Sequence, residues 1–75
     1  MALAKEVEEW RSLRDYPGYE VSNLGAVRES RSKQHLSIQK LDSKTLIVSL
    51  RRDGRASSRA VSALVEMAFP ELKVS

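Results

Sequence analysis

The chain has 75 residues, 31% of them charged, with no cysteine and a single histidine, His35. A chain this short forms one domain, and it buries only roughly 60% of the surface that its unfolded form exposes. The lack of cysteine excludes disulfides and thiolate metal sites, and one histidine excludes the histidine-rich centres of most metal-dependent hydrolases. We therefore expect residues 1–75 to form a single domain that holds no metal and no other cofactor.

The net charge is +3, and it is unevenly distributed. Residues 1–24 have three basic and five acidic side chains, whereas residues 25–75 have ten basic and five acidic ones. The basic part of such a chain is typical of a surface that binds a polyanion, although ordinary solvent-exposed charges would explain the same distribution. No apolar run approaches the ~20 residues that span a bilayer, and the acidic N-terminus does not resemble a signal peptide. We expect a cytoplasmic monomer without a membrane partner.

The first predicted element is a short helix over residues 2–10, because most of these residues are good helix formers. Leu3, Val7 and Trp10 would then lie on one face of the helix and pack on the rest of the domain. Pro17 and Gly18 stop any helix and indicate a turn.

Residues 19–30 predict a tight β-hairpin. Apolar and polar residues alternate on both sides of a turn at Asn23 to Gly25, which is the pattern of half-buried strands. Gly25 is expected to take a positive φ, and the side chains of Ser22 and Asn23 can bond the backbone of the turn. The side chains expected to face the core across this hairpin are Tyr19, Val21 and Val27.

The second half of the chain predicts a further hairpin and a helix. After a polar, basic loop over residues 30–35, residues 36–41 alternate as a strand does, and residues 45–50 are the strongest strand candidate because they are rich in β-branched residues. The pair Asp53-Gly54 is a hairpin turn signal, with a returning strand beginning over residues 55–58.

An apolar face with helical spacing follows this hairpin. Ser57 or Ser58 can cap a helix there, and Pro70 ends it. The predicted fold class is therefore α+β, with a short N-terminal helix, a small antiparallel sheet built of β-hairpins, and one amphipathic C-terminal helix packed on it. The apolar face consists of Val61, Leu64, Val65, Ala68 and Phe69, and both Phe69 and Trp10 are expected to be largely buried.

Catalytic patterns are missing, but basic side chains gather around the two predicted hairpins. There is no nucleophile elbow, no second histidine for a triad and no phosphate-binding glycine loop, so we expect no enzymatic activity. Arginine presents a planar fork of donors that suits phosphate and carboxylate groups. These residues could equally be solubilising turn residues, and His35 is expected to be an exposed loop residue rather than a ligand. The candidate partner-binding or nucleic-acid-binding residues are Arg11, Arg28, Arg31, Lys33, Arg51, Arg52, Arg55 and Arg59.

Two stretches carry a resemblance to a known family. Residues 9–13 contain Trp10, and residues 16–28 read Tyr-Pro-Gly-Tyr-Glu-Val-Ser-Asn-Leu-Gly-Ala-Val-Arg. This pattern resembles the NUMOD module, of the fourth class, found in HNH homing endonucleases, and the later strand and helix extend the similarity over roughly residues 8–71. The resemblance implies a structural motif formed by Trp10, Tyr19, Val21, Ser22, Asn23, Gly25, Val27 and Phe69.

The chain also departs from this family pattern. Relatives usually have Val-His-Arg-Leu-Val where residues 61–65 read Val-Ser-Ala-Leu-Val, which puts a DNA contact in this helix in doubt. We also expect the nuclease half to be missing, since no Asn-His-x-Asp-Gly metal-binding segment follows.

A module without a nuclease would act by binding alone. The chain is similar to small phage proteins that bind host RNA polymerase and alter initiation and termination, which implies a transcription regulator in the cytoplasm of a bacterial host, with possible nucleic-acid contact inside that complex. The alternatives are an autonomous DNA-binding module, either repressor-like or a remnant of a homing endonuclease, and a structural or assembly role.

Overall fold

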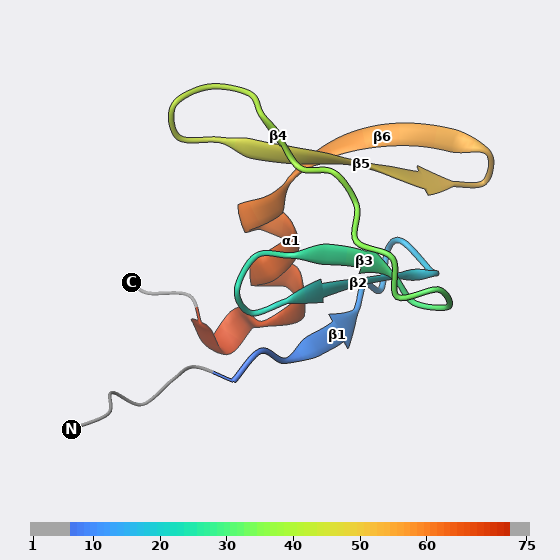
Figure 1. Ribbon diagram of the computed structural model, residues 1–75, viewed down its shortest axis with the longest axis horizontal. Coiled ribbons are helices and arrows are strands. Elements are labelled where there is room, and N and C mark those ends of the chain that lie inside the picture. The colour runs from blue at the N-terminus through green and yellow to red at the C-terminus, as the bar shows by residue number, and fades with distance from the viewer. Residues whose placement is uncertain (1–6, 73–75) are drawn as a thin grey trace.

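A computed structural model describes residues 7–72, and its first layer is a three-stranded antiparallel sheet. The sheet consists of β1 (Trp10–Ser12), β2 (Tyr19–Ser22) and β3 (Val27–Glu29) in that order (Figure 1). The register places Val21 opposite Val27, and both side chains are fully buried. This pairing confirms the hairpin predicted over residues 19–30.

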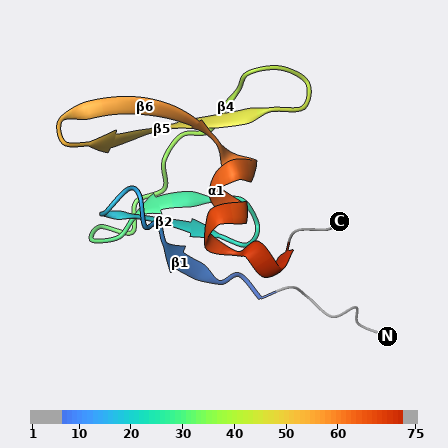
Figure 2. The ribbon, with the colours of Figure 1, turned by 180° about the vertical axis from the view of Figure 1, so that it is seen from behind.

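A second three-stranded antiparallel sheet forms the other layer, with β4 (Gln39–Lys40), β5 (Leu46–Arg52) and β6 (Arg55–Ala60) in that order. Asp53 and Gly54 join β5 to β6 with φ of 54° and 78°, so both residues lie in the left-handed region that a two-residue hairpin turn of this type requires. The predicted strand over residues 45–50 and the Asp-Gly turn are therefore confirmed. The turn projects away from the helix in both views (Figures 1 and 2).

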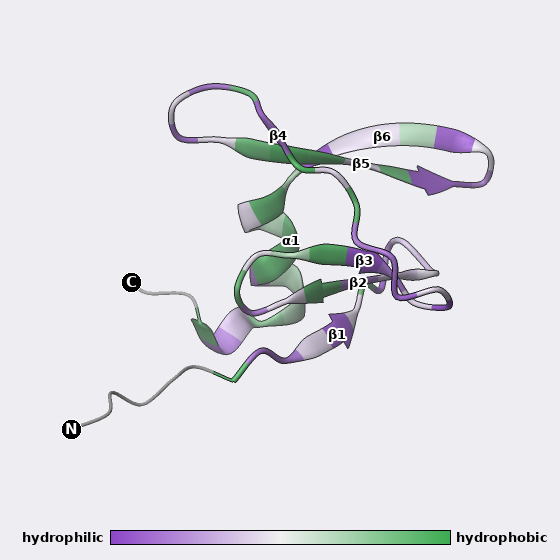
Figure 3. Cartoon of the chain, viewed as in Figure 1, coloured by the Kyte–Doolittle hydropathy of each residue, from purple (hydrophilic) through white to green (hydrophobic). Residues whose placement is uncertain are grey.

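One helix, α1 (Val61–Ala68), follows β6 directly and packs against both layers, and a short 3₁₀ helix, η1 (Pro70–Leu72), follows it. The apolar face of α1 is confirmed, because Val61, Leu64 and Phe69 are buried while Val65 and Ala68 pack partly buried against the core. Figure 3 shows apolar residues where the layers meet α1 and hydrophilic ones at the far end of the β5–β6 hairpin. The core consists of Leu13, Tyr16, Val21, Val27, Val48, Leu50, Val61, Leu64 and Phe69.

The helix predicted over residues 2–10 is not found in the part of the chain that the structure describes. Residues 2–6 lie outside the described residues, residues 7–9 have no regular structure, and Trp10 begins β1. Asn23 holds this approach in an extended form, because its Oδ1 accepts a hydrogen bond from the amide of Glu9 (2.8 Å) and its Nδ2 donates one to the carbonyl of Val7 (3.1 Å). Trp10 is half-buried rather than largely buried.

The turn between β2 and β3 follows the prediction for Ser22 and Gly25. The Ser22 hydroxyl accepts hydrogen bonds from the amides of Leu24 and Ala26, both at 3.1 Å, and Gly25 has a φ of 91°. Asn23 acts differently from the prediction, since its side chain bonds the approach to β1 instead of the turn.

Two further boundaries differ from the sequence prediction. Neither Ser57 nor Ser58 caps α1, because β6 continues to Ala60, which occupies the cap position without a side-chain hydrogen bond. The strand predicted over residues 36–41 is regular only at β4, because residues 36–38 cross from one sheet to the other. Among residues 7–72, no helix has the length and apolar character needed to cross a membrane.

Candidate nucleic-acid interface

Arg11, on β1, is engaged within the domain. Its guanidinium donates to both carboxylate oxygens of Glu71, with Nη2–Oε2 at 2.6 Å, and to the carbonyl of Ala68 at 2.8 Å. It also lies over the ring of Phe69, 4.2 Å from the centroid. The hydrogen bond between the two side chains raises the pKa of Arg11 and lowers the pKa of Glu71. This cation fastens β1 to the end of α1.

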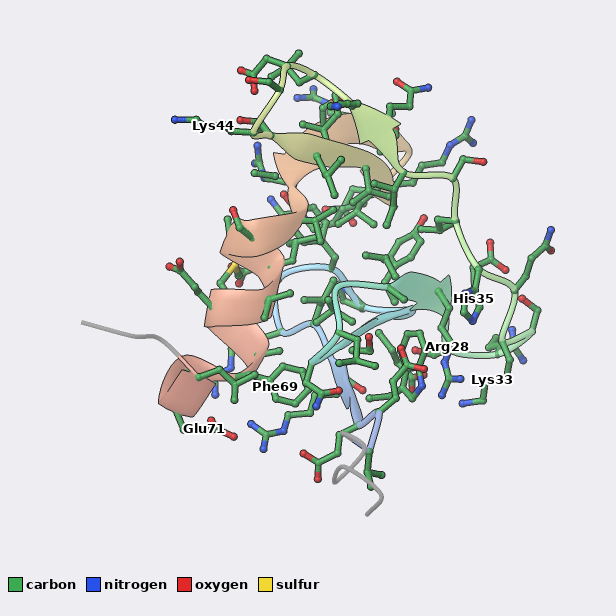
Figure 4. The ribbon with its side chains drawn as sticks, turned by 60° about the vertical axis from the view of Figure 1, so that its left-hand side comes forward. Arg28, Lys33, His35, Lys44, Phe69 and Glu71 are labelled. Carbon is green, nitrogen blue, oxygen red and sulfur yellow. The ribbon has the colours of Figure 1, made fainter. Side chains whose placement is uncertain are left out.

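Arg28, on β3, is the centre of a second internal cluster. Its Nε donates to Oε1 of Glu20 at 2.7 Å, and Nζ of Lys33 lies 3.5 Å from the same oxygen. The guanidinium lies 3.8 Å from the ring centroid of Trp10, and the ring of His35 meets Trp10 edge-on. The pKa of Glu20 is lowered, chiefly by the hydrogen bond from Arg28. Figure 4 shows Arg28, Lys33 and His35 side by side.

The arginines of the second sheet have a different kind of partner. Nη1 of Arg52 donates to the backbone carbonyl of Asp15 at 2.9 Å, and Nε of Arg59 donates to the hydroxyl of Tyr16. Both guanidinium groups lie over the buried ring of Tyr16, at 5.3 and 5.7 Å from its centroid. These acceptors are neutral, so Arg52 and Arg59 are oriented while their positive charge is left uncompensated.

Three more arginines complete this end of the domain: Arg31, Arg51 and Arg55. Each is exposed, and within residues 7–72 none of them forms an ion pair. Arg31 and Arg51 line the same shallow hollow beside Tyr19, whose hydroxyl accepts a hydrogen bond from the amide of Arg51 at 3.1 Å. Arg55 stands directly opposite Arg52 where the hairpin closes.

The eight predicted residues therefore separate into two groups. Arg11, Arg28 and Lys33 are paired with carboxylates of the domain itself and do not join the others. The remaining five lie on the β5–β6 hairpin or beside it, and we call them the basic end: Arg31, Arg51, Arg52, Arg55 and Arg59.

The sequence prediction missed the groups that position the basic end. Tyr16 and the carbonyl of Asp15 orient two of its arginines, and the exposed Arg14 lies in the same loop, between β1 and β2. The proximity of Tyr16 to Pro17 and Gly18 indicates a turn, but it does not reveal the distant partners of Tyr16 in β5 and β6. His35 is exposed, as predicted. Among residues 7–72, no three His, Cys, Asp or Glu side chains form a group that could hold a metal ion.

Taken together, the fold and the site define a small α+β domain in which five arginines without an ion pair among residues 7–72 lie on or beside one β-hairpin. The chain belongs to the NUMOD4 motif family, whose pattern matches residues 8–56. It is also similar to a solved structure of the HNH homing endonuclease I-HmuI, reported for DNA binding and cleavage, with a TM-score of 0.72 and 29% sequence identity. That similarity covers 81% of this chain and 36% of the endonuclease chain. Among curated proteins, none matches this sequence significantly.

Proposed function

We propose that this domain binds duplex DNA through its basic end and that residues 7–72 act by binding, without catalysis. The observation that carries the proposal is the way the arginines are held. At the basic end, Arg52 and Arg59 donate to a carbonyl and a hydroxyl, which fix their direction but do not neutralise them. The planar guanidinium groups of arginines oriented in this way can donate hydrogen bonds to the phosphate oxygens of DNA.

The comparisons support nucleic acid as the polyanion. The similar endonuclease structure is described by its DNA binding and cleavage, and the region shared with it includes most of this chain. The family pattern, residues 8–56, extends through β5 to Arg55. A protein that contacts several phosphates releases their counterions, so its DNA affinity falls steeply as salt rises.

Binding to RNA polymerase, with effects on initiation and termination, stays a prediction that no contact in residues 7–72 favours over DNA binding. A location in the cytoplasm of a bacterial host also stays a prediction. The absence of catalysis is likewise part of the proposal. It is supported by the lack of any group of three His, Cys, Asp or Glu side chains that could hold a metal ion among residues 7–72.

The test compares two double variants in fluorescence-anisotropy titrations with a labelled duplex over a range of salt concentrations. Arg52→Gln with Arg55→Gln removes two cations from the basic end. Lys40→Gln with Lys44→Gln removes two exposed cations from the other end of the same sheet, where Lys40 pairs with Leu46 at the start of β5. The arginine variant should lower the slope of log K against log salt by about 2, since each lost phosphate contact contributes about 0.9, and the lysine variant should keep the wild-type slope.

Two outcomes would contradict the proposal. Equal losses in both double variants would mean that total charge, and not the basic end, attracts the duplex. If duplex binding is lacking even at low salt, while RNA polymerase is captured from a nuclease-treated bacterial lysate, the polymerase prediction would replace it.

A further inference from the structure

A second surface lies where α1, η1, the β2–β3 turn and the start of β5 meet. These segments surround an open hollow of about 490 Å³, which we call the leucine hollow after the side chains described below. Figure 4 shows this side of the molecule, with Lys44 near the top and Phe69 near the bottom. Within residues 7–72, no arginine of the basic end lines the leucine hollow, so the two surfaces are separate.

The wall of the leucine hollow is apolar and exposed. It contains Leu24, Leu46 and Leu72, whose exposed fractions are 52%, 47% and 45%. These are three of the six large apolar side chains that are exposed within residues 7–72, and they come from three separate segments. Single exposed apolar side chains are normal on a protein surface, whereas several gathered in one concave place indicate an interaction site.

The rim of the leucine hollow has one charged side chain of each sign. Lys44 comes from the loop before β5 and Glu66 from α1, and both are exposed. Within residues 7–72, neither side chain forms an ion pair with the other or with a third group. The charge around the hollow is therefore balanced, in contrast with the basic end, and it does not suit a polyanion.

We propose that the leucine hollow is a contact surface between two copies of this chain, related by a two-fold axis. In a two-fold contact the same patch serves on both copies, so the patch must be complementary to itself. Lys44 of one copy pairs with Glu66 of the other, and the same pair forms again across the axis, on either side of the packed leucines. A partner of single charge sign would match only one of these residues, which is why a second copy is the occupant.

This inference does not depend on the proposed DNA binding, and it replaces the monomer that we expected from the sequence. A contact built around one hollow belongs to the small, transient class of interfaces, so the dissociation constant of the dimer should be roughly 10–100 µM. Sedimentation equilibrium in the absence of DNA, over about 1 µM to 1 mM protein, measures this constant.

Charge reversal tests the pairing across the axis. Lys44→Glu and Glu66→Lys each place like charges opposite one another twice, so each variant alone should dimerise at least about 10-fold more weakly than the wild type. An equimolar mixture of the two variants should recover the wild-type affinity, because every contact across the mixed dimer again joins opposite charges. Lys40→Glu is the matched control, since it makes the same change on β4 outside the hollow, and it should dimerise like the wild type.

A second pair of variants tests the apolar centre. Leu46→Gln should weaken the dimer by roughly 10-fold, because the substituted position lies in the contact of both copies. Met67→Gln is its control, since Met67 is equally exposed, at 47%, but does not line the hollow, and it should leave the dimer unchanged. All five substituted side chains are exposed, so circular dichroism spectra should match the wild type.

Three results would overturn the proposal. The first is a wild-type chain that stays monomeric at 1 mM, which would leave the hollow to a different protein partner. The second is a dimer that Lys44→Glu and Leu46→Gln leave intact, which would place the contact elsewhere. The third is a loss of dimer in both charge variants without recovery in their mixture, which would exclude the pairing of Lys44 with Glu66. Failure of DNA binding at the basic end is measured separately and changes none of these results.

Discussion

The turn between β2 and β3 depends on one buried hydroxyl, so Ser22→Ala should destabilise the domain measurably. Ser22 is fully buried, and its Oγ accepts hydrogen bonds from two backbone amides, those of Leu24 and Ala26. A hydrogen bond of this kind contributes roughly 0.5–1.5 kcal/mol. Loss of both should therefore lower the free energy of unfolding by about 1–3 kcal/mol, with little change in core volume.

This loss is large for a chain of 75 residues. Native domains are stable by roughly 0.05–0.15 kcal/mol per residue, or about 4–11 kcal/mol for this chain. At this size, 1 kcal/mol lowers the melting temperature by roughly 4–8 °C, so Ser22→Ala should melt about 5–20 °C below the wild type.

Thermal unfolding followed by circular dichroism measures the shift. Ser43→Ala is the matched control, because it removes the same atom from an exposed loop residue whose hydroxyl makes no hydrogen bond within residues 7–72. It should melt close to the wild type. A Ser22→Ala variant with the melting temperature of the control would refute the inference that the hydroxyl holds this turn.

Three further predictions concern stability. Gly25→Ala should lower the free energy of unfolding, measured by thermal melting, by about 1–2 kcal/mol, because a φ of 91° disfavours a residue with a side chain. The cost comes from the backbone and not from a clash, since the nearest atom to an added Cβ, on Val61, is 3.8 Å away. An unchanged melting temperature would contradict this prediction. Phe69→Ala should cost ~3–5 kcal/mol in urea unfolding, since the ring is 1% exposed, whereas Leu72→Ala, at an exposed position, should cost less. The pKa of Glu20 is lowered by Arg28, so its contribution is present above the unfolded pKa of about 4.3 and is lost as pH falls through the folded value. As the pH is lowered past roughly 4.5, the melting temperature of the wild type should therefore decrease, and that of Glu20→Gln should decrease less steeply. Identical pH profiles for the two proteins would disprove the contribution of the Glu20–Arg28 pair.

Local patterns in the sequence were sufficient to predict the elements whose structure depends on near neighbours. The hairpin over residues 19–30 shows alternation on both sides of a glycine turn, and Asp53-Gly54 has the two residues that tolerate positive φ. Val61, Leu64 and Phe69 repeat at helical spacing on a face that is then buried. Each of these signals lies within a few residues of the element that it predicts.

The errors occur where a distant contact overrides local preference. Glutamates and alanines near the N-terminus favour helix, but Trp10 pairs with Ser22, and Asn23 holds the backbone of residues 7–9 extended. The cap predicted at Ser57 or Ser58 failed for a similar reason, since both residues are still paired with β5. Both serines therefore lie before the cap position, which Ala60 occupies without a side-chain hydrogen bond.

The same limit applies to the arginines. Arg11 is a candidate binding residue in the sequence, but the carboxylate that neutralises it belongs to Glu71, 60 positions away. The partner of Arg28 is nearer, because Glu20 lies across the same hairpin. Sequence spacing places Arg52, Arg55 and Arg59 near one turn, and this proximity is confirmed. It does not reveal that Tyr16 lies beneath two of them.

Tyr16 links the folding of this domain to its proposed binding. A long arginine side chain loses rotamer freedom when it binds, typically about 0.5–1.5 kcal/mol for each side chain that is immobilised. Arg52 and Arg59 are already directed by a buried aromatic ring and neutral oxygens, so much of that entropy is lost when the domain folds. A carboxylate in place of these oxygens would order the arginines equally well but would compete with phosphate for them. With neutral acceptors, Arg52 and Arg59 are oriented before binding and keep their positive charge available to phosphate. Arg11 and Arg28 in the first sheet are also oriented, but carboxylates neutralise their charge.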